Sequence, residues 1–447
     1  AWTRAAAGGP QLAVVWGRRR VGKTFLLSHV ARGKRAVFFG ATQQAEAVEL
    51  HRLAETVRRE LGPRVADLAG GGFSNWEAAL RFFVALAADA PLLVVLDEVP
   101  YLARSTPGFA SIVQVVWDHI EPGTRLMLVL TGSAIGVIEA MLGASAALRG
   151  RPTLRLRLDP LDVVAARTFL PRLEPAIFLE AYAACGGCPL HLLEWEQDAT
   201  TRENLLHLAA TPGGILLEDT AGILREELPE SGGYPRILGA IGRGRTRFSD
   251  IASDAGQRIE YPLETLVQAG FVQKVLPVGA PKGARPTYEI ADPYLSFWFS
   301  VLYSSITDVE AGQGRAVLRR VEPLWQRHLG AVFEAAARAH ARRLVDQGAL
   351  PGFPEDLVVG RWWSTSGEPC EVDVLGLRGS RAYLLGAARW QQRPLDTRDL
   401  EALRRKVTRV PRPVDTPVYA LWGRGGVTSE VRQAGALGFD AEAMLTA

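Results

Sequence analysis

Lysine and cysteine are both scarce in this chain of 447 residues. The three cysteines are too few for the disulfide framework that is typical of small secreted proteins, so we expect a cytoplasmic protein. Only five of the 51 basic residues are lysines, and arginine supplies the others. The lysines stand at positions 23, 34, 274, 282 and 406. In such a background, a lysine at a place where the chemistry demands one is informative.

An excess of charge of one sign is also lacking. The 51 basic residues face 48 acidic ones, which leaves a formal net charge of +3 and gives little support to nucleic-acid binding. Apolar residues make up 48% of the chain and charged residues 22%, as in ordinary globular proteins. This composition excludes a largely disordered chain, and the length suggests about three domains.

A long uninterrupted hydrophobic run is missing as well. Residues 126–148 come nearest to one, with Glu139 as their only charge, but polar and glycine residues interrupt the stretch near position 132. We interpret it as a buried strand, a loop and a helix rather than a membrane span, and expect no membrane partner. The first ten residues do not have the layout of a signal peptide.

Residues 17–24 read GRRRVGKT, which is the G-x-x-x-x-G-K-T spacing of a phosphate-binding loop. An apolar run over 11–16 precedes it and a helix-like FLLSHV follows, so the motif lies between a predicted strand and a predicted helix. The glycines let backbone N–H groups curl around a phosphate, and a lysine adds a compact positive charge. A glycine-rich turn without a ligand is the alternative. The predicted nucleotide-binding residues are Gly17, Arg20, Val21, Gly22, Lys23, Thr24 and Phe25.

Acidic and hydroxyl residues follow two other predicted strands. The apolar run 92–96 leads into Asp97 and Glu98. A predicted strand over 125–130 is followed by Thr131, Gly132 and Ser133. Carboxyl ends of parallel strands are where ligands bind in α/β sheets. We therefore predict that Asp97, with the Thr24 hydroxyl, holds Mg²⁺, that Glu98 polarises an attacking water, and that Ser133 helps to orient it. Plain turns at the strand ends are the alternative.

The segments GRRRVGKT, LLVVLDEVPYL and LVLTGS together resemble the prokaryotic and archaeal AAA-like P-loop ATPases, relatives of the signal-transducing STAND-type NTPases. The resemblance implies ATP and Mg²⁺ as cofactors. It also implies a sensor arginine near the γ-phosphate, Arg149 or Arg151, with Arg151 as the candidate catalytic residue. A solvated basic loop is the alternative for these arginines. In a helical lid of the same family a G-G-x-P motif, here ending at Pro189, packs near the adenine.

A C-x-x-C pair, Cys185 and Cys188, overlaps the lid motif, and redox or zinc chemistry is one interpretation of this pair. No second Cys/His pair lies at ligand spacing, so we prefer small buried fillers. Residues 234–290 then have the order helix, helix, helix, hairpin, which is the layout of a winged helix. Its third helix carries Glu260 and Glu264, which would repel phosphates, so packing or a protein partner is favoured over direct DNA reading.

The C-terminal third resembles the PD-(D/E)xK nuclease-like domain of the same family. Such chemistry needs a carboxylate pair for Mg²⁺ and a lysine. Relatives often show E-C-K-W on the third strand, whereas Ala387 and Arg389 replace the glutamate and the lysine here. Glu334 and Asp373 remain as half of a metal site. The sequence therefore predicts an inactive nuclease domain, with a nucleic-acid or a protein partner still open.

The predicted fold is α/β, built around a P-loop NTPase parallel sheet. We expect the ATPase core at 1–158, a helical lid at 159–220, a winged helix with linker at 221–300 and the degenerate nuclease-like domain at 301–447. The predicted function is ATP binding and hydrolysis, with the Mg-ATP state controlling the winged-helix and C-terminal domains. The alternatives are a nucleotide switch that does not hydrolyse ATP and an ATP-regulated DNA-binding protein. Related ATPases include monomers and assemblies, so an oligomer stays open.

Overall fold

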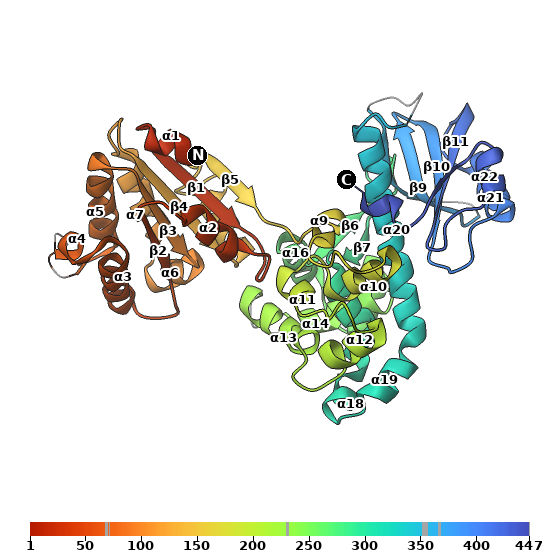
Figure 1. Cartoon of the computed structure of the whole chain (residues 1–447), viewed down its shortest axis with the longest axis horizontal. Helices are drawn as coiled ribbons and strands as arrows, with labels where there is room; N and C mark the ends of the chain where they lie inside the picture. Colours follow the sequence, from red (N-terminus) through yellow and green to blue (C-terminus); the bar gives the residue numbers. More distant parts are fainter. Residues whose placement is uncertain (68–69, 71, 229–231, 351–355, 365–367, 447) are drawn as a thin grey trace. The chain divides into compact units, whose positions relative to one another are not determined.

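The computed structural model describes residues 1–67, 70, 72–228, 232–350, 356–364 and 368–446. The chain folds into two compact units (Figure 1). The first comprises residues 1–160 and 225–228, and the second comprises residues 161–224 and 229–447. Within the described residues, none of the helices is both long enough and apolar enough to cross a membrane.

A five-stranded parallel sheet forms the centre of the first unit, which confirms the predicted α/β fold with a parallel core sheet. In spatial order the strands are β2 (Ala36–Gly40), β3 (Leu92–Asp97), β4 (Leu126–Gly132), β1 (Gln11–Trp16) and β5 (Leu154–Arg157). The apolar stretch over 126–148 is the strand β4 followed by the helix α8 (Ile135–Leu142), as the sequence predicts.

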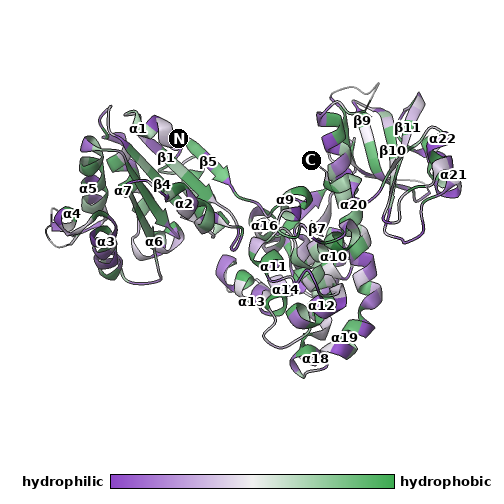
Figure 2. Ribbon diagram, viewed as in Figure 1, coloured by the Kyte–Doolittle hydropathy of each residue, from purple (hydrophilic) through white to green (hydrophobic). Residues whose placement is uncertain are grey.

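Alternate residues of each central strand serve two different cores. On β1, Leu12 and Val14 belong to one buried cluster, and Ala13 and Val15 belong to the other. Burial on both faces explains why these strands are continuous apolar runs, which Figure 2 shows in green. The helices α1 (Trp2–Ala6) and α2 (Lys23–Ala31) cover one face. Helices of the other face are α3 (Glu46–Leu61), α5 (Trp76–Asp89), α6 (Val99–Ser105), α7 (Phe109–Asp118) and α8.

The second unit begins with short helices and continues into a hairpin. The first five are α9 (Val163–Arg167), α10 (Pro175–Cys185), α11 (Pro189–Leu193), α12 (Thr201–Ala209) and α13 (Ile215–Glu227), whose last residues belong to the first unit. Next come α14 (Tyr234–Gly242), α15 (Phe248–Ala255), α16 (Glu260–Gln268) and the antiparallel strands β6 (Val272–Val275) and β7 (Thr287–Ile290). This order matches the predicted succession of elements, and a winged helix that binds DNA stays a prediction.

Several charges near that hairpin are paired with one another. Lys274 Nζ lies 2.7 Å from a carboxylate oxygen of Glu264, and Arg243 and Arg245 both pair with Asp254. The pairing of Arg243 and Arg245 with Asp254 leaves these two arginines less available to phosphates.

A mixed five-stranded sheet and a long helix, α20 (Glu322–Asp346), form the C-terminal part of the second unit. The sheet order is β12 (Leu437–Phe439), β11 (Pro413–Gly423), β10 (Arg381–Arg389), β9 (Glu371–Arg378) and β8 (Val358–Trp363). Trp422 Nε1 donates a hydrogen bond of 3.0 Å to His340 Nδ1, which fastens the sheet to α20. The remaining helices around this sheet include α21 (Thr397–Arg404) and α22 (Ser429–Gln433).

The C-x-x-C pair lies in a small buried polar cluster. Cys185 is fully buried, with Sγ 3.5 Å from the carbonyl oxygen of His191, and His191 Nε2 lies 2.8 Å from Asp219 Oδ2. Burial alone would lower the pKa of His191, but hydrogen bonds to Asp219 and Cys188 outweigh it and raise this pKa to about 9. Cys185 is buried as the sequence predicts, whereas Cys188 is only half-buried.

This cluster predicts a pH-dependent stability. Because the pKa of His191 is higher in the folded state than in the unfolded chain, its contribution is complete below about pH 6.5 and is lost as the pH rises toward 9. We expect the free energy of unfolding of the second unit to fall by about 3 kcal/mol over that window, measured by urea denaturation. His191→Gln should remove this pH dependence, and the exposed His207→Gln should retain it. An unchanged profile in His191→Gln would contradict the assignment.

Candidate functional site at the carboxyl edge of the first sheet

The loop between β1 and α2 has an unusual backbone. Gly17, Arg20 and Gly22 have φ angles of 156°, 65° and 94°. A Cβ on Gly17 would lie 2.0 Å from the carbonyl oxygen of Leu158, so only glycine fits there. Arg20 keeps a left-handed conformation that costs a non-glycine residue free energy. Such a sharply curled loop brings successive N–H groups toward one side, as a phosphate-binding loop requires.

Lys23 closes this loop from the inside. Its side chain is buried, and Nζ donates hydrogen bonds of 2.8 Å to the carbonyl of Gly17 and 2.9 Å to that of Arg18. Burial lowers the pKa of Lys23, while the carboxylates of Glu98 and Asp97 oppose that effect. An ammonium has three donors, so one of them remains for an anion.

A chain of hydrogen bonds joins the ends of α2, β3 and β4. Thr24 Oγ1 donates to Asp97 Oδ2 over 2.8 Å, and the Glu98 N–H donates to Asp97 Oδ1 over 3.0 Å. Burial raises the pKa of Asp97, and the bond from Thr24 opposes this. Hydroxyl and carboxylate oxygens are the ligands that Mg²⁺ prefers, so Thr24 and Asp97 fit the predicted ion.

Ser133 contacts Glu98. Its hydroxyl lies 2.8 Å and 2.9 Å from the two carboxylate oxygens of Glu98, and its N–H donates to Oε2 over 3.2 Å. Glu98 itself has a left-handed backbone, with φ of 54°. The structure therefore brings together five of the residues that the sequence singled out: Lys23, Thr24, Asp97, Glu98 and Ser133.

Other predicted site residues have different surroundings. Arg151 forms a two-pronged ion pair with Asp118 at the end of α7, with both N–O distances 2.7 Å. Phe25 is 75% exposed, whereas Val21 is buried. Pro189 begins α11 in the second unit, and its predicted role near the adenine stays a prediction.

Sequence reasoning missed two acidic residues at this site. The N–H of Arg19, within the glycine loop, donates a hydrogen bond of 2.9 Å to Glu227 Oε1, and the guanidinium of Arg19 pairs with Glu226. Burial raises the pKa of Glu227, and its Oε2 has no hydrogen-bond partner among the described residues. Glu227 is 208 positions away from Arg19, and both acids end an ordinary amphipathic helix, so no local pattern marks them.

Comparisons with known proteins give remote relatives. A family model described as "Archaea bacterial proteins of unknown function" matches residues 298–403. An uncharacterized protein of Methanocaldococcus jannaschii is 24% identical over 417 residues, which cover 91% of this chain and 88% of that protein.

Two solved structures also show similarity. A Walker-type ATPase of Pyrococcus abyssi is 19% identical to this chain. The match covers 67% of this chain and 93% of the ATPase chain, with a TM-score of 0.48. The ORC2 protein of Aeropyrum pernix, solved in ADPNP–ADP complexes, is 14% identical to this chain. The match covers 69% of this chain and 91% of the ORC2 chain, with a TM-score of 0.45. At this distance the functional argument rests on the residues of the site.

Proposed function

We propose that the protein binds ATP together with Mg²⁺ at the carboxyl edge of the first sheet and hydrolyses the ATP. The observation that carries this proposal is an ammonium held inside a glycine loop, next to a hydroxyl–carboxylate pair. Two carbonyls of the loop accept hydrogen bonds from Lys23 Nζ, and Thr24 Oγ1 lies 2.8 Å from Asp97 Oδ2. A glycine-rich turn without a ligand gives no reason to bury a lysine beside an aspartate.

Each residue has a defined task in this proposal. ATP would supply the phosphoanhydride bond that breaks, and Mg²⁺ the positive charge that its phosphates need. Lys23 holds a phosphate oxygen with the donor that the carbonyls leave unused. Thr24 and Asp97 hold the ion through oxygens that now hydrogen-bond to each other. Glu98, anchored by Ser133, orients the attacking water.

Removing the ammonium tests ATP binding. Lys23→Ala should raise the Kd for a fluorescent ATP analogue by at least about 10-fold, because a charge-assisted hydrogen bond contributes about 1.5–3 kcal/mol. Lys34→Ala, which removes another lysine of the same unit, should bind as the wild type does. Glu98→Gln should keep the wild-type Kd and lose turnover, measured as phosphate release. Unchanged binding and turnover in Lys23→Ala would refute the proposal.

A nucleotide switch that does not hydrolyse ATP is a second candidate, and one observation favours it. Ser133 engages both carboxylate oxygens of Glu98 through its hydroxyl and makes a third contact through its N–H. A glutamate held so completely has little freedom to take up a water. In this reading Ser133 restrains Glu98, whereas in the first reading it positions Glu98 for catalysis.

Ser133→Ala separates the two readings. If Ser133 positions Glu98, the variant should release phosphate about 10-fold more slowly, because one oriented hydrogen bond is lost. The Kd for ATP should not change. If Ser133 restrains Glu98, turnover should rise instead. We expect the decrease, and Ser28→Ala in α2 serves as the matched control. An increase would favour the switch.

The ATP state controls the rest of the chain through the last turn of α13 in this proposal. Glu227 accepts the hydrogen bond of an N–H in the glycine loop, where a phosphate oxygen would also bind. Its other oxygen is buried without a partner among the described residues, so its hold on the loop is incomplete. Phosphates therefore compete with Glu227, and ATP binding releases residues 225–228. The predicted control of the winged helix and the C-terminal domain would begin with this release.

Deleting the competing carboxylate should tighten ATP binding. Glu227→Ala is expected to lower the Kd for ATP by about 10-fold, since one charge-assisted hydrogen bond no longer has to be displaced. The control is Glu218→Ala, which removes an exposed acid of the same helix and should leave the Kd unchanged. Weaker binding in Glu227→Ala would show that this residue supports the loop instead of competing with phosphate.

A further inference from the structure

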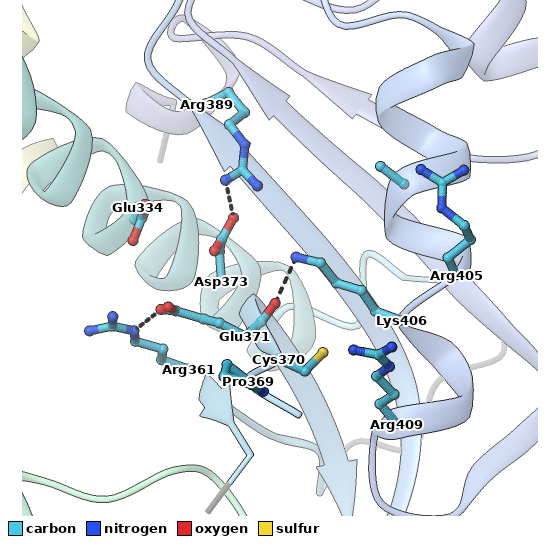
Figure 3. A pocket seen from close by; sticks show the side chains of 11 residues that line it. Glu334, Arg361, Pro369, Cys370, Glu371, Asp373, Arg389, Arg405, Lys406 and Arg409 are labelled. Atoms are coloured by element: carbon cyan, nitrogen blue, oxygen red, sulfur yellow. Dashed lines mark hydrogen bonds and ion pairs between the residues drawn. The ribbon is translucent and has the colours of Figure 1, made fainter. Parts of the chain in front are cut away.

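The second unit contains a charged pocket of about 650 Å³ between α20, the strands β8 to β10 and the turn after α21 (Figure 3). Three carboxylates line it: Glu334 from α20, and Glu371 and Asp373 from β9. Five cationic side chains line it as well, so positive charge is in excess. The pocket takes no part in the ATP site, which belongs to the first unit.

The three carboxylates are close enough together to suggest a metal ion. One ligand oxygen from each lies within 4.8 Å of the others. However, Asp373 Oδ2 already accepts a bond of 2.6 Å from Arg389 and one of 3.0 Å from the Ala388 N–H. Glu371 is likewise paired with Arg361. Each strand carboxylate thus carries an arginine in place of the charge that an ion would supply, and the residues do not fit the Mg²⁺ that nuclease-like domains imply.

The third carboxylate also has a cationic neighbour. Arg338 Nη1 lies 4.0 Å from Glu334 Oε2, one turn further along α20. Each of the three carboxylates therefore lies beside an arginine.

The opposite wall keeps unused positive charge. Lys406 Nζ donates one hydrogen bond of 2.7 Å, to the carbonyl of Glu371, and two donors of its ammonium remain. Arg405 makes no side-chain hydrogen bond or ion pair with the other described residues, while Arg409 pairs with Glu368. Figure 3 shows these side chains extending from the end of α21 and the turn beyond it. Lys406 is also one of only five lysines in the chain.

The pocket continues into a second hollow of about 420 Å³. The two share Arg361, Pro369, Cys370 and Glu371, and the second extends to Thr246 and Arg247 beside the hairpin. Arg405 and Lys406 line the first hollow and Arg247 lines the second, whereas Arg361, which lines both, is already paired with Glu371 and Glu289. Cations that line two adjoining hollows suit a ligand with several phosphates in a row better than one isolated phosphate.

We propose that the groove formed by these two hollows binds the phosphodiester backbone of a nucleic acid without a metal ion. Arg405 and Lys406 are its phosphate contacts, and Arg389 and Arg361 neutralise the carboxylates that would otherwise repel the ligand. Because these contacts go to the backbone, the groove reads no sequence.

The test is fluorescence anisotropy of the full chain with a labelled strand of about 24 nucleotides, its duplex and the matching RNA, in EDTA and without ATP. Binding should weaken linearly in log Kd against log salt. The double variant Arg405→Ala/Lys406→Ala should raise Kd by about 10-fold and reduce the slope by about 1.4–1.8, the value for two lost phosphate contacts. Arg381→Ala/Arg398→Ala removes two exposed arginines of the same sheet domain outside the pocket and should change neither quantity.

Several results would overturn the proposal. The first is that none of the three nucleic acids binds. The second is that both double variants lose the same affinity for nucleic acid. The third is that EDTA abolishes binding and Mg²⁺ restores it. Tripolyphosphate that competes as well as the labelled strand would indicate a small polyphosphate ligand instead. Melting temperatures of the variants control for folding. Lys23→Ala should bind the nucleic acid as the wild type does, which keeps this test separate from that of the ATP site.

Discussion

Parallel strand pairing in the first sheet is the constraint on which the site depends. Trp16 of β1 pairs with Gly132 of β4, and Leu96 of β3 pairs with Leu130 of β4, so three strands end at nearly the same level. The segments after these strands therefore meet at one edge: the glycine loop after β1, the acids at the end of β3, and Ser133 after β4. Because helices return the chain between parallel strands and cover the sheet, the central strands β1, β3 and β4 are buried on both faces. The polar side chains of the site therefore lie at the carboxyl ends of these strands.

Local motifs explain which parts of the site could be predicted. The loop, Asp97 and Glu98 each lie within a few residues of a strand end, so spacing along the chain was enough to place them together. The contact between Ser133 and Glu98 depends on rotamers, and the sequence suggested a water where the structure has a carboxylate. Glu227 could not be found, since its approach to the loop is a long-range contact without a motif. For the same reason Arg389 was recognised as a replacement while Lys406, which comes from another element, was overlooked.

The shortage of lysine separates two uses of positive charge in this protein. Arginine stays protonated in almost any surroundings, so it serves as a permanent counter-ion, as at Asp373 and Glu371. At these two sites, by contrast, a lysine gives only part of its hydrogen-bond donors to the chain. Lys23 gives two donors to loop carbonyls and Lys406 gives one to a strand carbonyl. In both proposals the donors that remain are the ones that meet a phosphate.

Competition at the glycine loop sets how the proposed ATP site can act on the rest of the chain. If Glu227 and a phosphate exclude each other, the free energy that holds residues 225–228 reduces the apparent affinity for ATP, and bound ATP weakens that hold by the same amount. The hold is limited, because Oε2 of Glu227 is buried without a hydrogen-bond partner among the described residues. A nucleotide of ordinary affinity can therefore displace it. Since these residues end a helix whose other residues belong to the second unit, the change is transmitted through the covalent chain and requires no particular docking of the two units.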